Sequence, residues 1–273
     1  MRSVIAIASL MAITSSATAR VVDHYYLHPE NVDQISKFRS CAGHHYGYDQ
    51  MFIDIGLFEV ETDPTETNRS MKHYFSPLAS FRSGASNNTL EIYAPFDGVI
   101  YRVTDEGHDS GFVNKQVWIQ SSASPDIFAI LFHVNLSDVF PQYWNDYPAE
   151  YWPYHGDDDA DFDRLTVTSG EAIGFADLRG TISDIAILKK INSTEYHYLS
   201  YFDETVMADS VFEIYREYDL TNRDDVIFSR EFRNANPLPE DCWDSRREDD
   251  WFSFTAIDSV PGIPVWLLYQ ATQ

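Results

Sequence analysis

Near the start of the chain, a histidine and an aspartate are spaced in a way that suits metal binding. His45 and Asp49 lie in the segment Cys41-Ala42-Gly43-His44-His45-Tyr46-Gly47-Tyr48-Asp49. In an extended segment this spacing places the imidazole and the carboxylate on one face, and Gly47 between them allows close approach of the backbone. A catalytic zinc ion takes three protein ligands and leaves a fourth position for water. The pair therefore provides two of the three ligands that such a site needs.

Four later motifs give this pair a context. They are Tyr93-Ala94-Pro95-Phe96-Asp97-Gly98-Val99-Ile100, Phe128-Ala129-Ile130-Leu131-Phe132-His133-Val134, Val167-Thr168-Ser169-Gly170-Glu171-Ala172-Ile173-Gly174 and Arg179-Gly180-Thr181-Ile182-Ser183-Asp184-Ile185. With the His45 segment, their order and spacing resemble the lysostaphin/LytM-type zinc endopeptidases over residues 41–188. That family has a His-x-Gly-x-Asp segment, an Ala-Pro-x-x-Gly-x-Val strand, a Tyr-x-His-Leu strand, a Gly-x-x-Ile-Gly turn and a closing His-Leu-His strand.

The resemblance implies a duplicated hybrid-motif β fold, with two antiparallel layers around a metal groove. By position, His45 and Asp49 correspond to zinc ligands and His133 to the strand histidine that assists catalysis. The closing His-x-His motif is degenerate. When the chains are aligned on Gly180, Asp184 takes the place of the third zinc ligand.

The same alignment puts Ile182 where the family has its general-base histidine. A shift of two residues instead puts Ala186 at the ligand position and Asp184 at the base position, and the sequence does not choose between the two alignments. A His-Asp-Asp set can bind zinc but favours harder ions than the usual set does. Loss of a positioned base typically costs a factor of about 10² to 10⁴ in rate.

These features predict an exported LytM-like domain with a degenerate catalytic site. The domain would bind a metal, a cell-wall peptide or glycan, or a protein partner. The alternative is an active zinc metalloendopeptidase that uses His45, Asp49 and Asp184 as ligands with His133 as the catalytic residue.

A basic segment, Arg69-Ser70-Met71-Lys72-His73-Tyr74, stands out on an acidic chain. Such a segment could hold a carboxylate or a phosphate of a ligand. It could equally pair with local acidic residues.

The elements that must position these residues are mainly strands. Short runs of β-branched and aromatic residues between turn residues indicate a β-sandwich or barrel-like domain. Apolar residues at helical spacing then predict a C-terminal amphipathic helix over 204–218, and a short helix that begins at Thr221 or Asn222 with Asp224 and Asp225 in its first turn. The expected strands are Met51 to Val60, Leu90 to Ala94, Gly98 to Val103, Gln116 to Gln120, Ile127 to Leu136, Ala172 to Phe175, Ile185 to Leu188 and Tyr196 to Phe202.

The N-terminus has the three parts of a secretory signal peptide. Met1-Arg2-Ser3 carries one positive charge, an apolar run follows from Val4 to Ile13, and a small-residue stretch ends at Ala17-Thr18-Ala19. We therefore expect residues 1–19 to be removed and the protein to be secreted or periplasmic. Residues 20–273 are then expected to form a single domain, with a LytM-like core over 41–188 and a strand-helix extension over 189–273.

The net charge limits the classes of partner, and the cysteine content predicts a disulfide. The formal net charge is −24 at pH 7, which disfavours nucleic acid and anionic lipid as partners. No later segment has the roughly eighteen apolar residues of a membrane helix, so we expect no membrane span. Because an exported chain meets an oxidising compartment, Cys41 and Cys242 are expected to form a disulfide.

Overall fold

The computed structural model describes residues 20–43, 51–53, 55–58, 60–61, 63, 65–66, 69–82, 90–105, 115–136, 166–176, 178, 182–239 and 248–254. The predicted signal peptide, His45, Asp49 and Cys242 lie outside these residues. Cys41 is described and is only 1% exposed, and its disulfide with Cys242 stays a prediction. Within the described residues, no helix combines the length and apolar character needed to cross a membrane.

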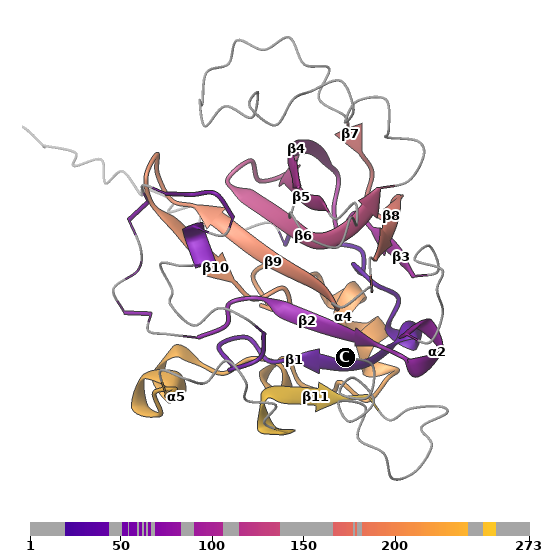
Figure 1. The fold of residues 1–273 in the computed structure, drawn as a ribbon, viewed down its shortest axis with the longest axis vertical. Helices are drawn as coiled ribbons and strands as arrows, with labels where there is room; N and C mark the ends of the chain where they lie inside the picture. The colour runs from indigo at the N-terminus through magenta and orange to yellow at the C-terminus, as the bar shows by residue number, and fades with distance from the viewer. Residues whose placement is uncertain are drawn as a thin grey trace, which may run out of the picture.

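The fold is mainly β, as predicted, and its described strands join in one antiparallel sheet. The main path runs β11-β1-β2-β9-β6-β5-β4-β7, with β10 paired to β9, and with β8 paired to both β3 and β6. Figure 1 shows this path from β7 through β6 and β9 down to β11. The strands are β1 (Val32–Ser36), β2 (His73–Pro77), β3 (Glu91–Tyr93), β4 (Gly98–Asp105), β5 (Lys115–Ser121), β6 (Ile127–Leu136), β7 (Thr166–Val167), β8 (Ala172–Ala176), β9 (Ser183–Lys190), β10 (Tyr196–Leu199) and β11 (Trp251–Ser253).

Short helices flank the sheet. The α-helices are α2 (Ala79–Arg82), α4 (Asp209–Arg216) and α5 (Arg230–Ala235), and the 3-10 helices are η1 (Pro29–Asn31), η3 (Arg223–Asp225) and η5 (Glu248–Asp250). In Figure 1, α4 lies behind the sheet and α5 lies beside β1 and β11. The C-terminal helical segment that the sequence predicted is therefore present.

The central strands are buried on both faces because apolar residues occupy both sets of alternating positions. On β6, Ala129 and Leu131 belong to a large core cluster that also contains Val211 and Tyr215 of α4. The intervening residues face a smaller cluster on the other side. This smaller cluster consists of Phe38, Met51, Phe52, Ile55, Met71, Trp118, Phe128, Ile130, Phe132, Ala186, Leu188 and Tyr198.

Most predicted strands are confirmed, and Ile127–Leu136 has the predicted bounds. The strand expected over Met51 to Val60 is wrong, because residues 51–53 are helical. Gly56, with φ +76, ends this turn in the left-handed conformation. Its N–H donates to the carbonyl of Ile53 at 2.8 Å, and Leu57 N–H donates to Phe52 at 2.8 Å. These are the two bonds of a Schellman cap.

The predicted C-terminal helix is real but shorter than expected. It begins at Asp209 rather than near residue 204. The Asp203 carboxylate accepts bonds from the backbone N–H and the hydroxyl of Thr205, which closes a turn instead of starting a helix. The short helix that follows is confirmed, since the Asn222 side chain caps η3 by accepting from Asp224 N–H.

Candidate functional site

Asp184 sits where three strands meet on the face of the smaller core cluster. In the antiparallel registers, Asp184 of β9 is directly opposite Phe132 of β6 on one side and Tyr74 of β2 on the other. Directly opposed residues share a face of the sheet. Asp184 is completely buried, at 0% exposure, so its carboxylate must find a partner inside the protein.

A β-bulge turns His133 toward the same face. Leu131 pairs with Val117 and Val134 with Lys115. Between these pairs β6 has two residues, Phe132 and His133, where β5 has one. His133 itself has φ +57, which is uncommon for a residue other than glycine. Without the bulge His133 would share a face with Leu131. The extra residue instead directs its imidazole toward Asp184, which is a common use of bulges beside functional sites.

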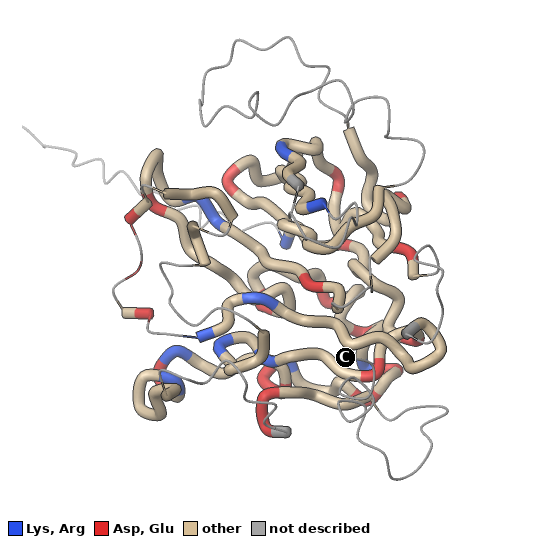
Figure 2. Tube along the Cα trace, in the orientation of Figure 1, with Lys and Arg blue, Asp and Glu red and all other residues tan. Residues whose placement is uncertain are grey.

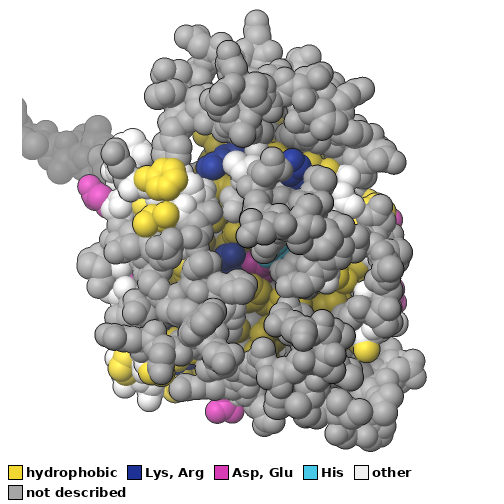
Figure 3. Space-filling view, viewed as in Figure 1, with side chains coloured by type: hydrophobic (Ala, Val, Ile, Leu, Met, Phe, Trp, Pro, Cys, Tyr) yellow, Lys and Arg dark blue, Asp and Glu magenta, His cyan; other side chains and the backbone are white. Residues whose placement is uncertain are grey.

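Lys72 supplies the charge that balances Asp184. Its ammonium lies 3.0 Å from Asp184 Oδ2, and the Lys72 side chain is only 8% exposed. His133 Nε2 lies 3.5 Å from Asp184 Oδ1, which is within ion-pair range but outside hydrogen-bond geometry. We call Lys72, His133 and Asp184 the Asp184 site. Figure 3 shows a basic, an acidic and a histidine side chain together near the middle of this face.

Aromatic rings complete the surroundings of the ammonium. Lys72 Nζ lies 3.4 Å from the centroid of the Phe132 ring, and the Tyr74 ring is 5.8 Å away. A ring face attracts a cation, most strongly where water is excluded. These contacts offset part of the cost of burying the lysine.

The structure brings together two of the four residues predicted for the metal site, Asp184 and His133. His45 and Asp49 lie outside the described residues, so their part in a metal site stays a prediction. The described chain ends at Gly43 before resuming at Met51, and Gly43 packs on the Tyr74 ring so closely that a Cβ there would overlap it. The segment that leads to His45 therefore reaches a direct neighbour of Asp184.

Comparison with known proteins gives a weak structural similarity. No protein-family model matches the chain, and no curated protein matches it. The NMR solution structure of lysostaphin shows a weak similarity, with a TM-score of 0.28 and 12% sequence identity. The match covers 50% of this chain and 43% of the lysostaphin chain.

The described part of the Asp184 site does not fit a zinc ion. Zinc would bind a carboxylate oxygen at about 2.0 to 2.2 Å, and Oδ2 already holds the Lys72 ammonium. Like unit charges about 4 Å apart repel by about 4 kcal/mol at an effective dielectric constant of about 20, and a divalent ion doubles the effect. Zinc at Asp184 would therefore have to bind Oδ1 against the repulsion of the ammonium or displace the ammonium from Oδ2.

The geometry also bears on the two possible alignments of the closing motif. Ala186 is buried in the smaller core cluster, and its methyl group offers no ligand atom. Whichever alignment holds, Asp184 is the residue of this stretch of β9 that can hold a cation.

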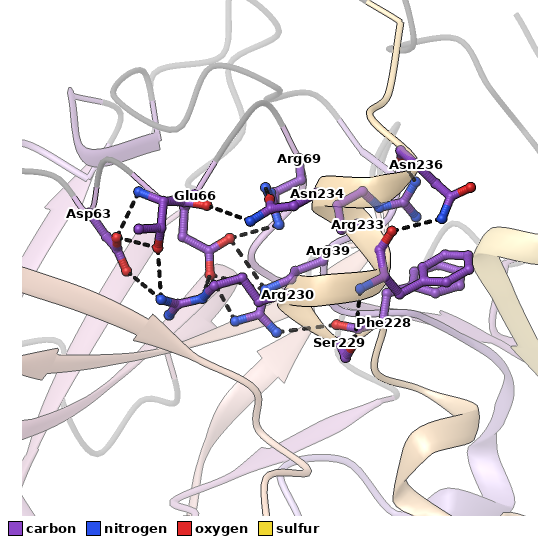
Figure 4. Close-up of polar contacts among 12 residues, drawn as sticks. Arg39, Asp63, Glu66, Arg69, Phe228, Ser229, Arg230, Arg233, Asn234 and Asn236 are labelled. Atoms are coloured by element: carbon purple, nitrogen blue, oxygen red, sulfur yellow. Dashed lines mark hydrogen bonds and ion pairs between the residues drawn. The ribbon is translucent and has the colours of Figure 1, made fainter.

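A second polar cluster surrounds Glu66, whose side chain is 2% exposed. Its carboxylate makes ion pairs with Arg39 at 2.8 Å, Arg69 at 2.8 Å and Arg230 at 3.0 Å. Figure 4 shows these guanidinium groups converging on the carboxylate. Figure 2 shows the basic residues gathered near α5. We call these four residues the Glu66 cluster.

The Glu66 cluster joins three parts of the chain. Arg39 Nη1 donates to the carbonyl of Phe228 at 3.2 Å, and Arg69 Nη2 donates to Asn234 Oδ1 at 2.7 Å. These bonds tie the end of β1 and the segment before β2 to α5. Charge-assisted bonds of this kind suit a structural role, because they fix orientation as well as add energy.

Lys72 is the residue of the Asp184 site whose place the sequence left open. Its basic segment was expected to bind a ligand anion or to pair with local acids; Arg69 does pair with a local acid, whereas the acid that Lys72 contacts is not local. Arg69 pairs with Glu66, and Lys72 pairs with Asp184. The partner of Lys72 is distant in sequence, so only the pairing of β2 with β9 reveals it.

Proposed function

We propose that this protein is an exported LytM/lysostaphin-like domain that binds its ligand without hydrolysing it. The ligand would be a cell-wall peptide or glycan, or a protein partner associated with the wall. One observation carries the proposal: the Lys72 ammonium is bound to Asp184, the residue that the resemblance puts at the third zinc position.

The chemistry of the remaining residues supports binding over hydrolysis. Peptide hydrolysis needs an activated water and a group that moves its proton, and a positioned base is worth about 10² to 10⁴ in rate. The alignment that makes Asp184 a ligand leaves Ile182 in place of that base. The Lys72 ammonium occupies Oδ2 of Asp184 at 3.0 Å, so this oxygen is not open to a water molecule.

An active zinc metalloendopeptidase remains the second candidate. The observation that favours it is the approach of His133 Nε2 to Asp184 Oδ1, at 3.5 Å. The resemblance assigns these two residues to one catalytic centre, and here they lie side by side. Zinc held by His45, Asp49 and Asp184 would then have to bind Oδ1 against the repulsion of the Lys72 ammonium or displace it from Oδ2.

Sedimentation with insoluble cell-wall sacculi tests the leading proposal. We expect residues 20–273 to co-sediment with the sacculi and to release no soluble peptide, with or without added zinc chloride. His133→Asn should weaken co-sedimentation, because His133 is the most exposed member of the Asp184 site, at 13%. Asparagine tolerates the left-handed backbone better than most residues do, so the bulge is kept.

His197→Asn is the matched control, since His197 pairs with Glu195 on β10 and not with Asp184. It should leave co-sedimentation unchanged. Zinc-dependent release of peptide fragments that His133→Asn abolishes would establish the enzyme instead. Equal binding by both variants and the parent would remove the Asp184 site from the binding surface.

A further inference from the structure

We propose that Lys72 is the resident cation of the Asp184 site, so that its ammonium holds the position of a metal ion and keeps divalent cations out. The inference deepens the proposed function and rests on it only in treating Asp184 as the metal-ligand position. What it adds is a residue, a charge and a cation selectivity that the sequence resemblance does not contain.

Asp184 needs a counter-charge inside the protein. Its carboxylate is at 0% exposure, and its neighbours Phe132 and Ala186 belong to the smaller apolar cluster. An ionised carboxylate in such surroundings needs a counter-charge within contact distance. A metal ion and an ammonium both meet that demand, so a protein can exchange one for the other.

Lys72 is held in a position where its ammonium supplies this counter-charge. Lys72 directly precedes β2, two residues before Tyr74, which is the β2 neighbour of Asp184. Its ammonium is fixed from two sides, by Oδ2 at 3.0 Å and by the Phe132 ring at 3.4 Å. A lysine in loose surface contact would be mobile, whereas only 8% of this side chain is exposed.

The charges of Lys72 and Asp184 balance each other. One carboxylate and one ammonium leave the pair neutral, and His133 carries no negative charge in any protonation state. Within the part of the chain that the structure describes, no group of three His, Cys, Asp or Glu side chains could hold a metal ion. Counted over the described residues alone, a divalent ion beside the neutral Lys72–Asp184 pair would leave the site with two positive charges.

Removal of the ammonium should therefore open the position to another cation. In Lys72→Ala, Asp184 keeps its burial and loses its counter-charge, and the truncated side chain leaves room beside Oδ2. The probe is zinc chloride alone, and the measurement is the thermal unfolding midpoint, Tm. A ligand that binds only the folded state raises Tm.

We expect zinc to leave the Tm of the parent protein unchanged. Lys72→Ala should unfold at a lower temperature than the parent, and zinc should raise its Tm by about 3 °C or more. Ethylammonium chloride should restore Tm in part, because it returns an ammonium without the rest of the side chain. In the double variant Lys72→Ala/Asp184→Asn the zinc effect should disappear.

Lys189→Ala is the matched control. Lys189 also pairs with an aspartate, Asp126, but at 4.0 Å and with the two side chains 33% and 48% exposed. Its removal should change Tm little and create no zinc response. A zinc response in this variant equal to that of Lys72→Ala would mean that zinc binds elsewhere on an acidic chain, and would overturn the inference.

Two further results would overturn it. One is a zinc-induced rise in Tm of the parent protein that Asp184→Asn abolishes, because Asp184 would then bind metal with Lys72 present. The other is a folded Lys72→Ala that does not respond to zinc. If Lys72→Ala is unfolded in buffer, refolding from urea becomes the readout: recovery with zinc alone supports the inference, and failure in both buffers contradicts it.

These results are independent of the sedimentation test. Loss of cell-wall binding would end the proposed function and leave the zinc response of Lys72→Ala as it is. Failure of the zinc response would leave the binding result standing.

Discussion

The protein buries two carboxylates in polar clusters, and the clusters are built in opposite ways. Glu66 is contacted by three arginines, while Asp184 has one lysine and a histidine. In the Glu66 cluster both carboxylate oxygens have close cationic partners. At the Asp184 site, Oδ1 makes no hydrogen bond within the described residues. Both Glu66 oxygens are occupied by guanidinium groups and the Glu66 cluster ties elements together, whereas Asp184 keeps acceptor capacity on Oδ1 next to an imidazole.

This difference gives a criterion for distinguishing a buried charge that stabilises the fold from one that can bind a ligand. A group whose hydrogen-bonding capacity is filled stabilises the fold and has nothing left with which to bind a ligand. A buried oxygen that keeps capacity costs stability, and such costs concentrate at functional sites. By this criterion the Asp184 site, which has fewer charges, is the better candidate for ligand binding.

Glu66→Gln should produce the largest loss of stability. The neutral amide would leave three guanidinium groups without their shared counter-charge, and breaking a buried pair costs about 3 to 5 kcal/mol. Urea unfolding of the variant and the parent measures the difference in the free energy of unfolding. Cell-wall binding at temperatures where the variant is folded should be unchanged.

Glu213→Gln is the control for this comparison. Glu213 pairs with Arg216 on the surface of α4, with the two side chains 58% and 47% exposed, so its loss should cost about 0.5 kcal/mol or less. Similar losses in both variants would mean that the Glu66 cluster contributes no more than a surface pair.

Acid should destabilise the protein through His73, a buried structural histidine that is not part of the Asp184 site. His73 donates from Nδ1 to the Ser36 carbonyl at 2.8 Å and accepts at Nε2 from the Ser200 hydroxyl at 2.8 Å. Burial lowers the pKa of His73 from 6.5 to about 4. Between these values the unfolded chain takes up a proton that the folded chain does not. Stability should therefore fall as the pH drops from 6.5 to 4, by about 3 kcal/mol in all.

Urea unfolding at several pH values, with His73→Gln beside the parent, measures this contribution. Glutamine can donate to Ser36 and accept from Ser200 but does not titrate, so the variant should lose this part of the pH dependence. His197→Gln should retain it, because His197 is an exposed partner of Glu195. An unchanged slope in His73→Gln would assign the effect to other groups.

Gly43→Ala should lower stability through local strain and should also alter binding. Gly43 has φ +85, and a Cβ there would overlap the Tyr74 ring. Strain and overpacking of this kind each cost about 1 to 3 kcal/mol. Because Tyr74 is the direct neighbour of Asp184, we expect weaker co-sedimentation with sacculi as well.

Gly170→Ala is its counterpart in the turn between β7 and β8. Gly170 has φ +78, and a Cβ there would overlap the His24 ring. Its cost in urea unfolding should be similar, and its binding should equal that of the parent. Equal loss of binding in both variants would show that binding follows global stability rather than the Asp184 site.

Most strands were predictable because their apolar residues occupy consecutive or alternating positions, as in Ile127–Leu136. The helical turn at 51–53 was mistaken for a strand, although Met51, Phe52 and Ile55 have helical spacing and Gly56 supplies a helix stop. Strand β1 was not predicted, since Val32-Asp33-Gln34-Ile35-Ser36 mixes polar residues into a buried strand. Its burial comes from pairing with β2 and β11, which local sequence does not express.

The candidate site was predictable in part. Motif order pointed to His133 and Asp184, and the structure brings them to 3.5 Å. The bulge at His133 was not predictable, because it shows only as a mismatch in register between β5 and β6. Lys72 was visible as a charge, but its partner depends on long-range strand pairing.

The bulge at His133 makes the number of residues in β6 a determinant of the geometry of the Asp184 site. Deletion of one residue between Leu131 and Val134 would restore plain alternation with β5. The strand would then carry either the Phe132 ring or the His133 imidazole at the position opposite Asp184, and the Asp184 site would lose the other. In chains descended from this one, a gap at this place would mark loss of the site, whereas substitutions among small apolar residues of the strand would not.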